Sequence, residues 1–215
     1  MDDKRNTLRV SETLRPLCAD VICFQEIHSR LPWSGKEDQP DVLSRQLGRR
    51  FYFHNCVQFG FGQYGIGIAT RLPVEEVHHH PLPGGKEARG ALELRLRNCA
   101  EIGKVSIFCT HWGLSEEERG LQAEALAEQI RLGPHPVIIC GDFNEGPEGA
   151  AVTKLRTLAK LQDCAITPEP TYPADNPNVR IDYILCSEAL ICRQYETVYS
   201  LASDHLPIVA DIETK

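Results

Sequence analysis

The chain has 215 residues, of which 42% are hydrophobic and 25% charged, a balance typical of a globular protein. Its net charge of -7 argues against a protein that attracts nucleic acid by overall charge, so a local site or metal ions must hold any polyanionic substrate. No apolar run approaches the roughly 20 residues that span a bilayer, and residues 1–9 show no signal-peptide pattern.

The first half of the chain predicts two helices and four strands. Residues 6–18 have apolar residues at helical spacing, with Asn6 or Thr7 as a possible cap. A buried strand over residues 19–26 ends in Glu26, and a surface loop over residues 28–40 leads to a helix over residues 41–47. The other strands are expected at residues 51–58, 65–70 and 90–97, and the glycines among them do not have the spacing of a phosphate-binding loop.

The second half predicts further strands with two helices between them. A strand over residues 104–110 leads to His111, and Ser115 with Glu118 forms a capping-box pattern before a helix that ends at Gly133. A strand over residues 137–140 and a helix over residues 149–160 follow, and a proline-rich loop over residues 167–178 is expected to cover one end of the fold. The last strands are expected at residues 180–186, 191–199 and 206–213.

The number and positions of the cysteines indicate the redox state of the cellular compartment in which the protein is found. The chain has nine cysteines, an odd number, and no CxxC pair. Cys23, Cys109 and Cys140 lie inside apolar strand-like runs. We interpret them as reduced core residues, which predicts a cytoplasmic protein.

Residues 137–145, VIICGDFNE, carry the most informative pattern in the chain. Gly141 breaks a buried strand, and Asp142 and Asn144 follow it two positions apart. On an extended backbone their side chains point the same way and can hold a water, a metal or a phosphate oxygen together. Asp and Asn are also ordinary turn formers, so this segment alone leaves both readings open.

Other polar residues lie at the ends of predicted strands, and they favour a site. Glu26, His111 and the Asp204-His205 pair follow strands, and Asp182 stands within one. Each has a structural alternative, such as a loop charge or a salt bridge, but charged residues in such places are seldom buried without a partner. Converging acids with two histidines predict an oxygen-rich site for Mg²⁺ or Mn²⁺.

Five ordered motifs give the chain a family resemblance. They are FQEI at residues 24–27, TH at 110–111, GDFN at 141–144, RIDYIL at 180–185 and SDHLP at 203–207. In this order they resemble the endonuclease/exonuclease/phosphatase superfamily, with pancreatic deoxyribonuclease, abasic-site endonuclease and sphingomyelinase among its members. ARGALEL at residues 88–94 is similar to small bacterial members of it. The resemblance implies a four-layer α/β sandwich of two mainly antiparallel sheets flanked by helices.

The resemblance also implies roles for the residues at matching positions. Glu26 is expected to be the principal metal ligand, with Asp204 completing the metal environment. Asp142 is expected to activate the attacking water, and Asn144 to hold that water or a phosphate oxygen.

The remaining roles concern the histidines. His205, oriented by Asp182, is expected to donate to the phosphate as charge builds. His111 is expected to act as a general acid or a second phosphate donor. Arg89 contacts phosphate or forms a structural salt bridge; both alternatives stay open.

One departure from the family pattern concerns the start of the chain. The family opens with a strand that ends in an asparagine, upstream of the first helix, whereas residues 1–6 resemble the loop after it. We expect one domain over residues 1–215 that lacks this strand, and interpret Asn6 as a helix cap. For the same reason, the presence of an N-terminal targeting segment stays an open alternative.

Two side-chain groups are left out of the expected site. His78, His79 and His80 stand beside prolines and glycines, which predicts an exposed turn. Trp33 and Trp112 could stack on a base or sugar, and packing in the core or at its rim is the other reading.

The sequence therefore predicts a monomeric, metal-dependent phosphoesterase, either a nuclease or a phosphatase. Its substrate is a nucleic-acid end, a small phosphoester or a lipid headgroup, and the acidic balance counts against tight binding of long duplex DNA. The alternative, motivated by the missing first strand, is a catalytically impaired binding or scaffold protein on the same fold.

Overall fold

The computed structural model describes residues 6–99 and 102–215. Its helices are α1 (Thr7–Leu14), α2 (Gln39–Leu47), α3 (Glu116–Leu132) and α4 (Ala150–Ala159), with 3-10 turns η1 (Arg15–Leu17) and η2 (Pro32–Ser34). The strands are β1 (Val21–Ser29), β2 (Arg50–Phe59), β3 (Gly62–Thr70), β4 (Val74–Leu82), β5 (Arg89–Cys99), β6 (Gly103–His111), β7 (Val137–Asp142), β8 (Leu161–Asp163), β9 (Asp182–Ser187), β10 (Leu190–Thr197) and β11 (Ile208–Thr214).

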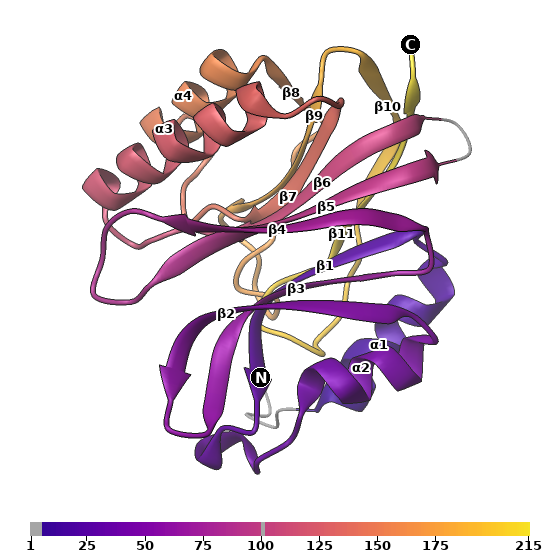
Figure 1. Ribbon diagram of the computed structural model, residues 1–215, viewed down its shortest axis with the longest axis vertical. Coiled ribbons are helices and arrows are strands. Elements are labelled where there is room, and N and C mark those ends of the chain that lie inside the picture. The colour runs from indigo at the N-terminus through magenta and orange to yellow at the C-terminus, as the bar shows by residue number, and fades with distance from the viewer. Residues whose placement is uncertain (1–5, 100–101) are drawn as a thin grey trace.

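The strands form two sheets and a ribbon. A six-stranded sheet has the order β4-β5-β6-β7-β9-β8, a three-stranded sheet has the order β1-β3-β2, and β10 pairs with β11 alone. Within the six-stranded sheet, β6 and β7 are parallel and the other neighbours are antiparallel. Helices α3 and α4 cover the outer face of the large sheet, and α1 and α2 cover the small one (Figure 1). This confirms the predicted four-layer sandwich.

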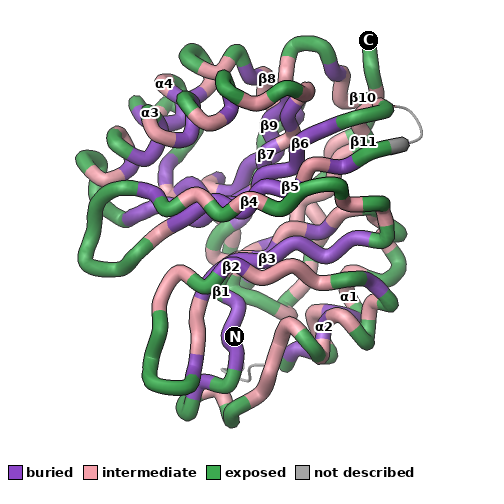
Figure 2. Tube along the Cα trace, viewed as in Figure 1, coloured by how far each residue is buried: buried purple, intermediate pink, exposed green. Residues whose placement is uncertain are grey.

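An apolar layer fills each of the three interfaces of the sandwich. One lies between α3, α4 and the large sheet and includes Leu126 and Leu155. The second lies between the two sheets and includes Ile68 and Leu94. The third lies between the small sheet and α1 and α2 and includes Leu43. The central strands are accordingly buried along most of their length, whereas the helices expose one side (Figure 2). The continuous apolar runs of the sequence arise because both faces of these strands are covered.

Local sequence signals placed the helix starts well. The side chain of Asn6 accepts hydrogen bonds from the backbone N–H of Leu8 (3.1 Å) and Arg9 (3.2 Å), which confirms it as the cap of α1. The capping box of Ser115 and Glu118 is present at the start of α3. Trp112 is fully buried in the core, while Trp33 is 57% exposed.

The prediction of an exposed turn at the triple histidine is wrong. His78, His79 and His80 lie within β4, which pairs along its length with β5. Their side chains go to different partners: His78 to Glu76, His79 against the ring of His54, and His80 to the buried Glu93. β4 accommodates Pro81, which has no backbone N–H to donate, because this residue lies near the end of an edge strand.

All nine cysteines are free thiols. Of the three cysteines expected in the core, Cys109 is buried, while Cys23 and Cys140 are half-buried. In the described part of the chain, no helix is both long and apolar enough to cross a bilayer.

Candidate active site

Three of the expected site residues stand in one row across adjacent strands. In the register of the large sheet, His111 of β6 lies beside Asp142 of β7, and Asp142 lies beside Asp182 of β9. Gly141 permits this close pairing, because a Cβ there would lie 2.2 Å from the carbonyl oxygen of Thr110. The sheet thus assembles the row from segments far apart in the sequence.

His205 joins the row from the loop before β11. Its Nδ1 lies 2.9 Å from Oδ2 of Asp182, and its Nε2 lies 3.9 Å from Oδ2 of Asp142. The loop is anchored by backbone hydrogen bonds from Leu206 N to Thr171 O (2.8 Å) and from Ala174 N to Asp204 O (2.7 Å). The two acids therefore flank one imidazole.

The charges of these groups depend on one another. Burial, together with the charges of Asp182 and Glu26, raises the pKa of Asp142 to about 7. Burial by itself would lower the pKa of His205, but the hydrogen bond and charge of Asp182 outweigh it and raise that pKa to about 9. At neutral pH the imidazole of His205 is therefore protonated, and the carboxyl group of Asp142 is present in both its protonated and its ionised form.

His111 is held in a single tautomer. The Nη1 atom of Arg89 lies 2.8 Å from Nδ1 of His111, and since a guanidinium can only donate, Nδ1 is the acceptor. The ring proton is therefore on Nε2, which lies 3.5 Å from Oδ2 of Asp142. Burial and the charge of Arg89 lower the pKa of His111 to about 3, so the ring is neutral at physiological pH.

Arg89 is engaged by protein groups on both sides. In addition to His111, its Nη2 atom lies 3.1 Å from Oε1 of Glu87, and its side chain is only 9% exposed. The contact with Glu87 is the salt bridge expected as one alternative for Arg89, and the phosphate contact stays a prediction.

Asn144 shapes the turn after β7. It has a left-handed backbone, with φ of 50°, and its N–H donates to Oδ1 of Asp142 at 2.7 Å. Its side-chain Nδ2 donates to the carbonyl oxygen of Trp112 at 2.9 Å. The two expected site residues of this turn are thus locked together, which confirms that they form the turn, and their part in a site stays a prediction.

Glu26 reaches the site through an irregularity in β1. The pairing of β1 with β3 shifts register between Phe24 and Ile27, and Glu26 between them has φ of 55°. A bulge of this kind re-aims a side chain, and non-glycine residues with such a backbone concentrate at functional sites. Glu26 is exposed and lines the same cavity as Asp142, Asp182 and Asp204.

The carboxylates suit a hard divalent cation by their chemistry. Burial is the main cause of the raised pKa of Asp142, and the negative charges of Asp182 and Glu26 add to it; a cation among these carboxylates would relieve that repulsion. Asp204 is exposed and accepts a hydrogen bond from Ser203 at 3.2 Å. Among residues 6–99 and 102–215, however, no three His, Cys, Asp or Glu side chains already form a metal-holding group.

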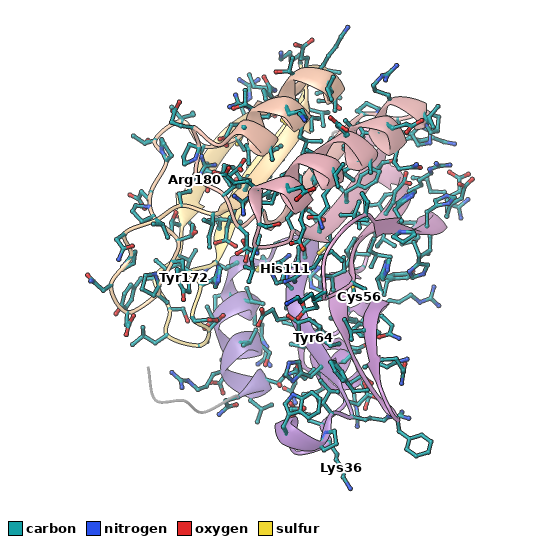
Figure 3. The ribbon with its side chains drawn as sticks, turned by 90° about the vertical axis from the view of Figure 1, so that its left-hand side faces the viewer. Lys36, Cys56, Tyr64, His111, Tyr172 and Arg180 are labelled. Carbon is teal, nitrogen blue, oxygen red and sulfur yellow. The ribbon has the colours of Figure 1, made fainter. Side chains whose placement is uncertain are left out.

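The structure adds two aromatic neighbours that the sequence did not indicate. The ring of Tyr172 lies 4.8 Å from that of His205, and Tyr172 is 37% exposed. Tyr64 lies close to Glu26, and burial with this negative charge raises the pKa of its hydroxyl. Figure 3 shows Tyr64, His111 and Tyr172 on the same side of the molecule. Only the tertiary fold brings these tyrosines to the site.

A buried ion pair between Arg119 and Glu145 stabilises the turn after β7. The carboxylate of Glu145 accepts hydrogen bonds from Arg119 Nε (3.1 Å) and from the first N–H groups of α4, at Ala151 and Val152 (both 2.8 Å). Its backbone oxygen accepts from the hydroxyl of Tyr183 at 2.8 Å. A carboxylate at a helix N-terminus is stabilising, so Glu145 fixes the segment after Asn144 to both α3 and α4.

The model of the endonuclease/exonuclease/phosphatase family matches residues 2–205. No curated protein matches the chain.

Solved structures with the same fold share little sequence with the chain. A protein of this family from Beutenbergia cavernae is 22% identical with a TM-score of 0.81, the match covering 99% of this chain and 67% of that one. One from Bacteroides vulgatus is 18% identical with a TM-score of 0.83, covering 97% and 90%. A mannosyl-6-phosphatase from Bacteroides thetaiotaomicron is 16% identical with a TM-score of 0.77, covering 96% and 90%. With the family model covering nearly the whole sequence, the chain belongs to the endonuclease/exonuclease/phosphatase family.

Proposed function

We propose that the chain is a divalent-metal-dependent hydrolase that cleaves a phosphoester by in-line attack of water. Phosphoester hydrolysis is the chemistry of its family, and a mannosyl-6-phosphatase shares its fold. The observation that carries the proposal is the position of Asp142, between His111, Asp182 and His205, with its pKa raised to about 7. A general base works best when its pKa lies near the operating pH.

Asp142 acts as the base in this proposal. Its Oδ2 atom takes a proton from the attacking water as the water oxygen bonds to phosphorus. The bond from phosphorus to the leaving oxygen breaks, and the electron pair departs with that oxygen. Asn144, whose N–H already holds Oδ1 of Asp142, keeps Oδ2 turned toward the water.

His205 stabilises charge on the phosphate. Its raised pKa keeps it protonated at neutral pH, and the hydrogen bond from its Nδ1 to Asp182 leaves Nε2–H as the donor. His111 donates in the same way through Nε2–H. A neutral ring with a pKa of about 3 suits a donor better than a general acid, which supports the donor role for His111.

Glu26 and Asp204 would hold the cation, Mg²⁺ or Mn²⁺. When bound there, the cation polarises the phosphoryl oxygen and stabilises the leaving oxyanion. Tyr64 next to Glu26 would limit the orientations of that carboxylate.

The proposed substrate is a small phosphoester or a nucleic-acid end, bound by a monomer. Tyr172 offers an exposed aromatic face beside His205 for a sugar or base of the leaving group. The net charge of -7 argues against long duplex DNA.

A panel of substrates tests the proposal. A sugar 6-phosphate, a chromogenic phosphodiester and a single-stranded DNA end would each be offered with Mn²⁺, Mg²⁺ or EDTA. The proposal predicts turnover of at least one substrate with metal and none with EDTA. Turnover that persists in EDTA contradicts it, and so does metal binding without hydrolysis of any substrate, which would favour the binding-protein alternative.

A further inference from the structure

Three cysteine side chains from different strands meet where the large sheet contacts the β10-β11 ribbon. Cys164 follows β8, Cys186 lies in β9 and Cys192 lies in β10. All three belong to or pack against the apolar cluster between β7, β9 and the ribbon. Asp182 begins β9, and Cys186 lies near its end, about 13 Å further along the strand. This thiol cluster is therefore separate from the candidate active site, and β8, β9 and β10 share one end of the molecule (Figure 1).

The thiol of Cys164 lies between the other two. Its Sγ donates to Sγ of Cys186 across 3.7 Å, and its thiol also forms a hydrogen bond with that of Cys192. The backbone N–H of Cys164 donates to the carbonyl oxygen of Ile184 at 3.0 Å, which continues the pairing of β8 with β9. Cys164 is thus held in place by the sheet, with a thiol neighbour on the sheet and another on the ribbon.

Cys192 connects the thiol cluster to solvent. Cys164 and Cys186 are buried, whereas Cys192 is half-buried. The pairing of β10 with β11 shifts register directly after Cys192, and Sγ of Cys192 donates to the carbonyl oxygen of Gln194 at 3.0 Å. A bulge of this kind re-aims a side chain. A small oxidant that arrives from solvent therefore meets Cys192 first.

Cys186 is the proton acceptor of the thiol cluster. The hydrogen bond from Cys164, helped by one from Nε2 of Gln162 at 3.4 Å, lowers the pKa of Cys186 to about 7, although burial acts in the opposite direction. The same contact with Cys186, together with burial, raises the pKa of Cys164 far above its usual value. Most buried thiols are inert packing residues, but here a protonated thiol donates to a partial thiolate.

We propose that Cys164, Cys186 and Cys192 form a site of reversible oxidation by peroxide, which joins Cys164 to Cys192 in a disulfide. The bond would tie the segment after β8 to β10, and so the large sheet to the ribbon. Cys186 would serve as the base and remain a thiol. The proposal follows from the positions of the three thiols and does not depend on the proposed hydrolysis.

The reaction takes two steps. The thiolate of Cys192, its proton lost to solvent, attacks one oxygen of hydrogen peroxide, the O–O bond breaks and hydroxide leaves, so that Cys192 carries a sulfenic acid. Cys164 then passes its proton to the thiolate of Cys186 while its sulfur bonds to that of Cys192, the S–O bond breaks and hydroxide leaves. Once the released protons have neutralised both hydroxides, two thiols have been oxidised to a disulfide and one peroxide reduced to two waters.

Mass spectrometry after peroxide treatment tests the proposal. The wild-type chain, treated with a few equivalents of hydrogen peroxide and digested without reductant, should give linked peptides that contain Cys164 and Cys192 and that dithiothreitol separates. In Cys164→Ser and Cys164→Ala the link cannot form, and a dimedone reagent should label the sulfenic acid on Cys192 instead. Cys18→Ser alters an exposed thiol outside the cluster, and this control should form the link as wild type does.

A second measurement tests the role of Cys186. In Cys186→Ser the proton acceptor is lost, so the link should form about tenfold or more slowly, while sulfenic acid should form on Cys192 at the wild-type rate. A third measurement shows whether the native fold accommodates the bond. The oxidised chain should melt about 5 °C or more above the reduced one, because the disulfide closes a loop of about 30 residues in the unfolded chain.

Several outcomes would overturn the proposal. They are a link between Cys164 and Cys186 while Cys192 stays reduced, sulfenic acid on Cys186 in place of Cys192, and no link at peroxide concentrations that oxidise Cys18. A melting temperature that falls on oxidation would show that the bond forms only where native packing is lost, which also contradicts it. None of these readouts requires turnover, so a failure here leaves the proposed reaction untouched.

Discussion

The carboxylate of Asp182 lies 2.9 Å from Nδ1 of His205 and flanks the imidazole opposite Asp142. This contact connects the large sheet to the loop before β11, and it sets the charge of the histidine. Asp182→Asn should preserve the hydrogen bond while removing the negative charge. We expect turnover to fall about 10- to 100-fold, because a partner that orients and charges a site residue is worth that much. An unchanged rate would exclude Asp182 as the positioning group.

The same contact predicts the titration of His205 in metal-free protein. Its imidazole should stay protonated through neutral pH and lose its proton at about pH 9. In Asp182→Asn the loss should move to lower pH, since burial then acts with less opposition. NMR titration of the ring protons measures both. A value in wild type near the usual 6.5 would contradict the geometry.

Arg89 should control the tautomer of His111. In Arg89→Met the donor to Nδ1 is lost, so the ring can carry its proton on either nitrogen and its pKa should rise from about 3. Nitrogen chemical shifts of the imidazole distinguish the tautomers, and turnover should drop about tenfold or more. Arg95→Met, which alters another arginine of β5 whose partners are Glu76 and Glu93, is the control and should leave both readouts of the site unchanged.

Glu145 should matter for stability more than an exposed acid does. Glu145→Ala leaves the guanidinium of Arg119, only 10% exposed, without its partner, and should cost about 3 kcal/mol of the free energy of unfolding. Glu124→Ala breaks the exposed pair with Lys154 and should cost less than about 1 kcal/mol. Urea denaturation gives both values. Equal losses would show that the buried pair has no special part in fixing the turn.

The lowered pKa of Glu93 leads us to expect that the protein loses stability in acid. Burial would raise its pKa, but hydrogen bonds from His80, Arg95 and Ser106 lower it from 4.5 to about 2. A carboxyl group with a lowered folded-state pKa stabilises the fold above its unfolded pKa, and this contribution is lost as the pH falls from about 4.5 toward 2. In Glu93→Gln the stability curve should be flatter over that range. Parallel curves for the two proteins would contradict the account.

The family resemblance implied the architecture, whereas local signals predicted the helix starts and the strand before Asp142. Asn6, the capping box at Ser115 and the apolar run before Asp142 each act within a few residues. The missed strand β4 shows where local signals fail. Prolines beside His78, His79 and His80 indicate a turn, while pairing with β5 and contacts to Glu93 and His54 make the segment a strand.

The site was predictable as a set of residues and not as an arrangement. Motifs supplied Asp142, Asp182 and His205, but the row from His111 to Asp182 depends on strand register, which is fixed only when the sheet forms. Tyr172 and Tyr64 belong to none of the sequence motifs, and only tertiary contacts place them beside His205 and Glu26.

The most direct test of the central claim is the turnover of Asp142→Asn on whichever phosphoester the wild-type chain cleaves, with Mn²⁺ and with the released phosphate measured. The account predicts a loss of about a thousandfold, the contribution of a general base, with the fold intact by circular dichroism. Asp41→Asn, which alters an exposed acid on α2, is the matched control and should keep wild-type turnover. An Asp142→Asn variant that turns over within a few-fold of wild type would contradict the role of Asp142 as the base.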